Sequence, residues 1–245
     1  MTKIVFFTVV DERNAPYAEM MFNSLKKFHP DVETITYTTK DSDDPHMFYR
    51  QKPLFGRLLL EQGYDLVIGM DADQVVTGSL DHLFTDDYDV GVVLNWNRVD
   101  PQKYNFPLTV WDIGNENYYN CGLVAMRSLK LVNHWWRICN RSNFVNYRFR
   151  EQDLLNIICH YGDYDVKCFD HSSNWHGLVS SGEWLNFKLD GDRLYLPVVN
   201  NYPEEEKTIK VIHYAGGNVS RKMTFNKDFT PEIATHLKGL CHGKK

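Results

Sequence analysis

Two aspartates one residue apart, Asp71 and Asp73, are the side chains with the clearest potential for chemistry in this sequence. They follow the apolar stretch LVIGM at residues 66–70 and precede the apolar QVV at residues 74–76. A charged group beside buried apolar chain is unfavourable unless a hydrogen bond, a counter-charge or a metal ion compensates it. The pair is therefore compatible with three roles: capping a turn or helix, attacking a phosphate, or holding a hard divalent cation through oxygen ligands. The pair alone does not choose among them.

The segments before this pair alternate between strand-like and helix-like patterns. Continuous apolar or β-branched runs predict strands, and apolar residues three and four apart predict helices. This alternation predicts an open parallel sheet with helices on its faces. Because ligands of such sheets bind outside the carboxyl ends of the strands, Asp71 and Asp73 should face that crevice. The strands are expected at residues 3–10, 33–39 and 65–70, and the helices at residues 17–28 and 53–63.

The rest of the chain continues the α/β pattern. Residues 107–119 are the best candidate for a long irregular excursion, which often serves as a lid or a binding loop. No internal repeat, low-complexity segment or linker interrupts the sequence, so residues 1–245 are expected to form a single domain. Further strands are expected at residues 88–95, 121–127, 192–198 and 207–217, and further helices at residues 128–140 and 151–162.

Composition excludes several classes of function. The net charge is −5 and the basic residues are scattered, which argues against a nucleic-acid surface. The basic cluster at residues 141–150 is more simply an exposed helix–loop junction than an anion site.

No apolar run predicts a transmembrane helix and the N-terminus lacks a secretory cleavage site, so we expect a cytoplasmic protein. The five cysteines contain no CxxC pair, which favours reduced, mostly buried thiols over a zinc site.

Six short motifs in a fixed order connect the aspartate pair with the rest of the chain. They are FFTVV followed by APYA (residues 6–18), QKPLFGRLLL (51–60), MDADQVVTGSLDHLF (70–84), YYNCGLVAMRS (118–128), REQDLLN (150–156) and VIHYAGG (211–217). With these motifs the chain resembles the metal-dependent glycosyltransferases of the GT-A fold, and most closely family 8, which contains glycogenin and the galactosyltransferases of lipopolysaccharide synthesis. The resemblance extends over roughly residues 3–217.

The resemblance implies a Rossmann-like, mixed and mostly parallel central sheet flanked by helices in a single GT-A domain. It also implies a division of that domain along the sequence. The nucleotide-binding part would comprise about residues 1–95, the acceptor and sugar part about residues 96–220, and a C-terminal segment residues 221–245.

The resemblance further implies a site for Mn²⁺ or Mg²⁺ and a UDP-sugar. The metal ligands would be Asp71, Asp73 and His213, and Lys52 would pair with the first aspartate or with donor oxygens. In the family an aromatic residue stacks on the base, which suggests Tyr17, although this tyrosine is equally suited to cap the apolar face of the first helix. The residues implied for donor binding are Thr8, Val9, Val10, Tyr17, Lys52, Asp71, Ala72, Asp73, Gly216 and, replacing a lysine that glycogenin-like members carry after this glycine, Arg221 and Lys222.

On the sugar side the resemblance implies catalytic roles for Asn120, Glu151 and Gln152, although the family commonly has Asp where Glu151 stands. Gly122 would permit close approach of the backbone. The simpler alternatives are a turn-forming asparagine and an acid in the first turn of a helix. The residues Asn-Trp-His at 174–176 match acceptor-side positions only weakly, and a buried tryptophan is at least as compatible with this motif.

The implied activity is transfer of a sugar from a UDP-sugar to a hydroxyl group of a glycan or protein acceptor, with retention of configuration. Retention needs either a nucleophile, for which Glu151 is the only acid that the motifs offer, or front-face attack assisted by the leaving phosphate. Two alternatives stay open. One is a phosphatase of the haloacid dehalogenase type with Asp71 as nucleophile, although that motif normally ends the first strand. The other is a non-catalytic sugar-nucleotide-binding module. A homodimer is compatible with the sequence.

Overall fold

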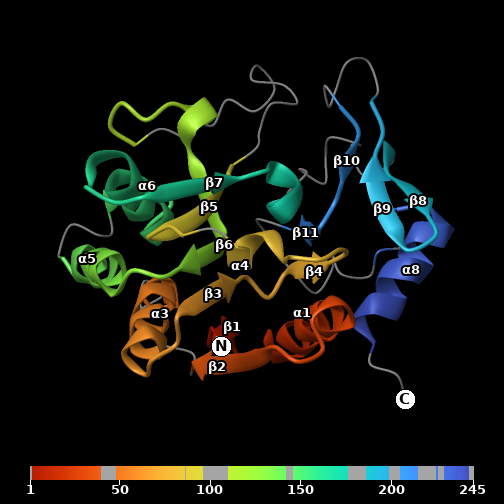
Figure 1. Cartoon of the computed structure of the whole chain (residues 1–245), viewed down its shortest axis with the longest axis horizontal. Coiled ribbons are helices and arrows are strands. Elements are labelled where there is room, and N and C mark those ends of the chain that lie inside the picture. The colour runs from red at the N-terminus through yellow and green to blue at the C-terminus, as the bar shows by residue number, and fades with distance from the viewer. Residues whose placement is uncertain are drawn as a thin grey trace.

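The computed structural model describes residues 2–39, 48–85, 87–95, 110–141, 146–175, 186–198, 205–214, 225 and 229–242. At its centre is a six-stranded sheet with the strand order β2–β1–β3–β6–β5–β7 (Figure 1). Strand β6 runs antiparallel to both of its neighbours, and the other pairs are parallel. The predicted mixed, mostly parallel sheet is therefore confirmed. The strands are β1 (Ile4–Asp11), β2 (Glu33–Thr39), β3 (Leu66–Met70), β5 (Val90–Leu94), β6 (Tyr119–Met126) and β7 (Val166–Phe169).

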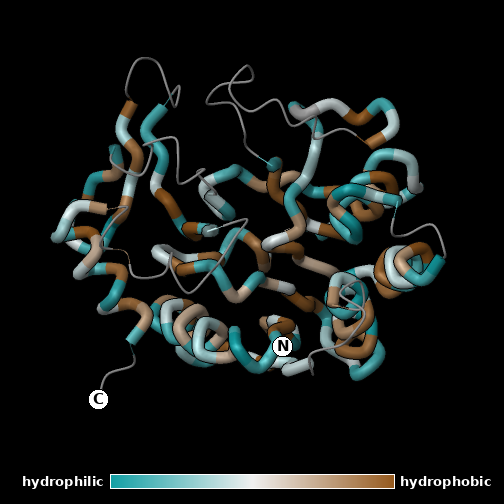
Figure 2. Tube along the Cα trace, turned by 180° about the vertical axis from the view of Figure 1, so that it is seen from behind, coloured by the Kyte–Doolittle hydropathy of each residue, from teal (hydrophilic) through white to brown (hydrophobic). Residues whose placement is uncertain are grey.

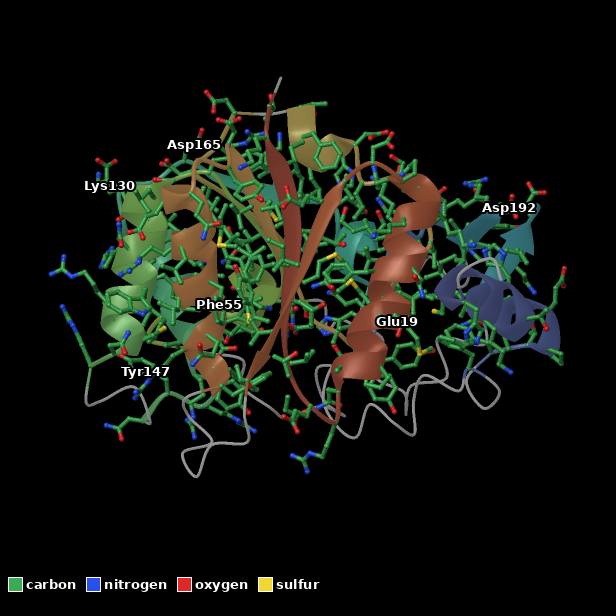
Figure 3. The ribbon with its side chains drawn as sticks, turned by 90° about the horizontal axis from the view of Figure 1, so that it is seen from below. Glu19, Phe55, Lys130, Tyr147, Asp165 and Asp192 are labelled. Atoms are coloured by element: carbon green, nitrogen blue, oxygen red, sulfur yellow. The ribbon has the colours of Figure 1, made fainter. Side chains whose placement is uncertain are left out.

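Helices cover both faces of this sheet, because side chains alternate between the two faces along each strand. In β1, Phe6 packs into the core layer under α1, whereas Phe7 packs into the layer shared with α3, α5 and α6. Viewed from below, α3 with Phe55 and α1 with Glu19 lie on opposite sides of β2 (Figure 3). In Figure 2 hydrophobic segments concentrate in the interior between these layers. The helices are α1 (Ala15–Phe28), α3 (Gln51–Glu61), α4 (His82–Thr85), α5 (Leu129–Cys139), α6 (Glu151–Tyr161) and α8 (Pro231–Cys241).

A second, smaller core lies beside the main sheet. It contains buried aromatic residues, among them Trp175, Phe187 and Tyr214, together with Leu237 from α8. The sequence did not predict α8, whose first turn is capped by the Thr230 side chain and begins with a proline. The strands around this core are β4 (Gln74–Val76), β8 (Lys188–Asp190), β9 (Arg193–Leu196), β10 (Lys207–Thr208) and β11 (Val211–His213).

The antiparallel pair β4–β11 connects the two cores. His213 stands opposite Gln74 in the register, and the backbone N–H of Tyr214 donates to the carbonyl of Asp73 at 3.0 Å. Residues 207–217 were expected to be one strand-like run, but β10 and β11 pair with different partners. These contacts fix β11 beside Asp71 and Asp73.

The expected excursion is irregular in its described part, residues 110–118. A turn closed by a bridge between Val110 and Ile113 leads into the short helix η1 (Asn115–Asn117). Residues 107–109 lie outside the described residues.

The remaining expectations concern the surface and the thiols. Arg141 and Arg148 are exposed, as predicted for a helix–loop junction. All five cysteines are free, and three of them are buried, namely Cys121, Cys139 and Cys241. Among the described helices, none combines the length and apolar character needed to cross a membrane.

The edge of the sheet offers a test of the packing between β5 and β7. A Cβ atom on Gly91 would lie 2.3 Å from Phe169 Cε2 and 3.2 Å from Tyr88 Cε2. We therefore expect Gly91→Ala to lower the free energy of unfolding by about 1–3 kcal/mol through overpacking, measured by urea denaturation. Gly239→Ala is the matched control, because among the described residues no atom outside its own stretch of helix lies within 4 Å of its Cβ position in α8. It should stabilise by about 0.5–1 kcal/mol, and equal effects of both variants would contradict this packing.

Candidate metal centre and active site

Three potential metal ligands meet at the carboxyl end of β3. Asp71 follows β3, Asp73 precedes β4 and His213 ends β11, and these strands lie together in the middle of the molecule (Figure 1). His213 Nε2 lies 3.5 Å from Asp71 Oδ2 and 3.2 Å from Asp73 Oδ1. One ligand atom from each residue lies within 4.8 Å of the others. Two carboxylates and one imidazole are a set of ligands that can hold a divalent cation.

Lys52 in α3 forms a buried ion pair with the first aspartate of this group. Its Nζ donates to Asp71 Oδ1 at 2.5 Å and to the Cys121 carbonyl oxygen at 2.6 Å. Burial lowers the pKa of Lys52, but the Asp71 carboxylate outweighs it and raises the pKa above its usual value. Burial raises the pKa of Asp71, but Lys52 and His213 together hold it well below its usual value. The expected pairing between Lys52 and the first aspartate is therefore present, and both groups are charged at neutral pH.

The histidine responds to the same carboxylates. Burial lowers the pKa of His213, but Asp73 and Asp71 outweigh it and raise the pKa to about 9. The protonated imidazole therefore supplies the positive charge next to the two carboxylates. A divalent cation that binds here would replace this proton, because only the neutral imidazole can be a metal ligand.

Gly122 provides the space for this histidine. A Cβ atom on Gly122 would lie 2.2 Å from His213 Cε1 and 2.6 Å from His213 Nδ1. The Gly122 carbonyl also accepts from the Asp71 N–H at 2.8 Å. The glycine was expected to permit close approach of the backbone to the sugar; in the structure the His213 ring fills the space that a side chain at this position would need.

Asn120 and Gln152 lie beside Asp71, Asp73 and His213, which we call the metal group. Both side chains form hydrogen bonds within the chain. Asn120 Oδ1 accepts from the Gly122 N–H at 2.7 Å. Gln152 Oε1 accepts from the Cys121 N–H at 3.0 Å, and its Nε2 donates to the Tyr118 hydroxyl at 3.3 Å. Gln152 therefore fixes the first residues of β6 to the start of α6.

Glu151 lies at the start of α6, close to the same strand. The Cys121 thiol donates to Glu151 Oε1 at 3.7 Å, and the other oxygen, Oε2, is buried without a hydrogen-bond partner in the described part of the chain. Burial raises the pKa of Glu151 to about 8. The carboxyl group is therefore protonated at neutral pH. The neighbouring Asp153 accepts from the Tyr118 hydroxyl at 2.5 Å and from the Phe149 N–H at 2.9 Å, so its role is structural.

The residues expected around the nucleoside lie at the carboxyl end of β1 and the start of α1. Thr8 and Val10 are buried, and Val9 is partly buried against the core under α3. Tyr17 packs against the smaller core, which agrees with the alternative that it caps an apolar face of α1. Ala72 lies in the turn between the two aspartates. Three residues expected at the diphosphate, Gly216, Arg221 and Lys222, lie outside the described residues.

Two of the three weakly expected acceptor-side residues are described by the structure, and both are buried. Asn174 and Trp175 have exposed fractions of 1% and 2%, and Trp175 belongs to the smaller core. His176 lies outside the described residues. Trp175 is therefore buried, which is the alternative stated in the sequence analysis, and it offers no surface for stacking on a sugar.

Solved structures share this arrangement of elements. A galactosyltransferase, LgtC, crystallised with donor and acceptor sugar analogues, is 17% identical, with a TM-score of 0.57 over 97% of this chain and 95% of that chain. The chain has the GT-A fold. A glycosyltransferase involved in glycosylation of the major capsid of PBCV-1 is 11% identical, with a TM-score of 0.55 over 96% of this chain and 99% of that chain. GlyE of Streptococcus pneumoniae TIGR4 is 14% identical, with a TM-score of 0.55, and this chain covers 62% of it. No protein-family model and no curated sequence matches the chain.

Two supporting residues of the site, Gln74 and Asn95, were not recognised in the sequence, and Asn174 was noted only in the weak acceptor-side motif. These three residues form hydrogen bonds with one another or with Asn120. The only sequence signal of Gln74 and Asn95 is an amide side chain at the end of a strand, which is common in turns.

The raised pKa of Glu151 predicts a pH-dependent effect on stability. Between the unfolded value near 4.5 and the folded value of about 8, the unfolded chain is ionised while the folded protein keeps its proton. This group therefore lowers the free energy of unfolding as pH rises, by about 1.4 kcal/mol per pH unit at most. Glu151→Gln removes the effect, so this variant should gain stability relative to the parent protein between about pH 5 and about pH 8. Urea denaturation at both pH values measures it.

Glu19→Gln, at an exposed position in α1, is the control for that measurement. If both variants change stability equally at the two pH values, Glu151 is not protonated in the folded protein.

Proposed function

We propose that the protein is a metal-dependent glycosyltransferase that moves a sugar from a UDP-sugar to a hydroxyl group of a glycan or protein acceptor. The observation that carries this proposal is the group of Asp71, Asp73 and His213 within 4.8 Å of one another at the carboxyl ends of the strands in a GT-A fold. Ligands of open α/β sheets bind at this edge. Support also comes from the structural neighbours, which are named as glycosyltransferases.

The donor set fits a divalent cation. Two carboxylates and one imidazole would hold Mn²⁺ or Mg²⁺, which supplies Lewis-acid stabilisation of the departing diphosphate when it is bound. Lys52 fixes Asp71 through Oδ1, leaving Oδ2 directed to the histidine side. Gly122 and the β4–β11 pairing hold His213 in position. Thr8, Val9 and Val10 would line the nucleoside part of the site, with Gly216, Arg221 and Lys222 at the diphosphate.

The state of Glu151 favours one of the two retaining mechanisms. A protonated carboxyl group is a poor nucleophile, and burial raises the pKa of Glu151 to about 8. Front-face attack, in which the leaving phosphate takes the proton of the acceptor hydroxyl, is therefore the mechanism that we favour. Glu151 and Asn120 then shape the sugar subsite without forming a covalent bond.

The phosphatase alternative has weaker support. Its nucleophilic aspartate needs one oxygen open to the phosphate, but Lys52 binds Oδ1 of Asp71 and His213 lies 3.5 Å from Oδ2. In addition, β3 is the third strand of this chain and not the first. A measurement of UDP-sugar turnover distinguishes the remaining alternative, because a non-catalytic module would bind the donor without turning it over.

Removing a metal ligand tests the proposed function. Asp73→Asn leaves a neutral amide in place of a charged ligand, so UDP release from a UDP-sugar with Mn²⁺ should fall at least about a hundredfold. EDTA should abolish release by the parent protein, and Mn²⁺ should restore it. Asp31→Asn, at an exposed position, is the control and should keep full activity.

Turnover that survives EDTA would contradict the proposal. Hydrolysis of p-nitrophenyl phosphate that is lost in Asp71→Asn would establish the phosphatase instead. Binding of UDP with Mn²⁺ but no turnover of any UDP-sugar would establish the non-catalytic module.

A second substitution separates the two retaining mechanisms. If the leaving phosphate assists a front-face attack, Glu151→Gln should keep kcat within about tenfold of the parent, because the amide replaces a neutral acid of the same shape. A covalent nucleophile at this position would instead make the loss about a thousandfold or more. Steady-state UDP release at saturating acceptor measures this difference, and the control is Glu19→Gln.

A further inference from the structure

Four amide side chains form a continuous series beside the metal group, which we call the amide relay (Gln74, Asn174, Asn120 and Asn95). Gln74 Nε2 donates to Asn174 Oδ1 at 2.8 Å, Asn174 Nδ2 donates to Asn120 Oδ1 at 2.9 Å, and Asn120 Nδ2 donates to Asn95 Oδ1 at 2.9 Å. Their exposed fractions are 0%, 1%, 6% and 8%. Buried amides need hydrogen-bond partners, and here they supply one another.

One backbone group sets the direction of the relay. The Gly122 N–H points at the Asn120 side chain, and the acceptor lies 2.7 Å from the nitrogen. An N–H group only donates, so the atom facing it is the Asn120 oxygen and not its nitrogen. Asn174 must then present its NH₂ group to that oxygen, which turns its own oxygen towards the NH₂ group of Gln74.

The end of the relay is consistent with this direction. Gln74 Oε1 is buried without a hydrogen-bond partner among the described residues. An unsatisfied buried acceptor is unfavourable, and turning the Gln74 amide over would only place two acceptors, its Oε1 and Asn174 Oδ1, against each other. The direction imposed at Gly122 therefore extends along the whole series.

The relay shares its backbone with the metal group. Gln74 follows Asp73 and stands opposite His213 in the β4–β11 register. Asn174 precedes Trp175, whose carbonyl accepts from the His213 N–H at 2.7 Å. On the other side, the Cβ position of Gly122 lies 2.7 Å from Asn120 Oδ1 as well as 2.6 Å from His213 Nδ1. The amide of Asn120 and the imidazole therefore lie against the same glycine.

We propose that Asn174 is a positioning residue that, together with the Gly122 N–H, holds the Asn120 amide in a single orientation in the sugar subsite, an inference that rests on the proposed function of this site. Asn174 and the Gly122 N–H occupy the Asn120 oxygen, and Asn95 takes one N–H of the Asn120 nitrogen. Among the described residues the second N–H has no protein acceptor, so it is the group that Asn120 offers to a ligand. Asn120 would therefore act as the hydrogen-bond donor to a hydroxyl oxygen of the donor sugar. Reversal of the amide would present an acceptor instead.

Substitution of Asn174 by its isosteric acid tests this role. In Asn174→Asp the carboxylate cannot donate to Asn120 Oδ1, so kcat/KM for the UDP-sugar should fall at least about tenfold at about pH 8. Most of the loss should appear in KM for the donor. As pH falls, the new carboxyl group becomes protonated and can donate again, so the ratio of variant to parent activity should rise. Asn174→Ala loses the donor without gaining a titratable group, and its ratio should stay constant with pH.

Two further variants make the result specific. Asn95→Asp keeps an acceptor for Asn120 Nδ2, so it should lose much less activity than Asn174→Asp. Asn140→Asp, at an exposed position at the end of α5, should behave like the parent. If Asn174→Asp is no worse than Asn95→Asp, or its activity ratio does not rise at lower pH, the relay does not orient Asn120.

A measurement without turnover separates this inference from the proposed function. The NMR signal of the Asn120 side-chain NH₂ group, identified by its loss in Asn120→Asp, should exchange slowly with solvent in the parent protein. It should shift and exchange faster in Asn174→Asp and Asn174→Ala. An unchanged signal in both variants would overturn the positioning role even if the enzyme turns over. A changed signal in a protein without turnover would support the relay while refuting the glycosyltransferase.

Discussion

The ion pair between Lys52 and Asp71 is the interaction on which the rest of the site depends. It places a buried ammonium group 2.5 Å from a carboxylate, and the Cys121 carbonyl takes a second N–H of the ammonium. Lys52 reaches this position because α3 packs closely against the sheet. A Cβ atom on Gly56 would lie 2.8 Å from Met126 Sδ, and one on Gly69 would lie 3.2 Å from the ring of Phe7. The glycines thus allow the close packing that brings a lysine beneath the aspartate.

This pair also determines the charge of the metal group. With a protonated His213, two carboxylates face two cations, Lys52 and the imidazolium, and the group is neutral. A divalent cation that displaces the histidine proton changes the sum to one positive charge, since Lys52 remains protonated. A nucleotide diphosphate is the kind of ligand that this charge attracts. Without Lys52 the sum would be zero, so the buried lysine prepares the site for an anionic donor and also fixes Asp71.

The sequence could predict five of the six strands of the main sheet, and the place of the aspartate pair, because both depend on local patterns. The apolar run of β3 ends at Asp71, and the carboxyl-end rule then locates the crevice. His213 was found only through the resemblance, since a histidine after a strand has no specific meaning alone. Strand β7 was not predicted because only Phe169 of its four residues is buried, and α8 was not predicted although Thr230 and Pro231 are a typical helix start.

The amide relay was beyond prediction for a different reason. Gln74 and Asn174 are 100 residues apart in the sequence, and an amide before a strand predicts a turn more readily than a long-range hydrogen bond. Only the pairing of β4 with β11, and the contact of β11 with Trp175, brings these side chains together. Non-local hydrogen bonds of this kind depend on the completed fold, whereas the strand pattern does not.

The choice of amides next to a charged metal group has a physical reason. An acidic or basic side chain in the place of Asn174 would add a charge near His213 and alter the balance set by Lys52, because charges interact strongly at short distance in a buried site. Amides can donate and accept while remaining neutral at every pH. The metal side of the site is therefore governed by charge and the sugar side by the direction of hydrogen bonds. The buried oxygen of Gln74, which lacks a partner among the described residues, is the cost of keeping that direction fixed.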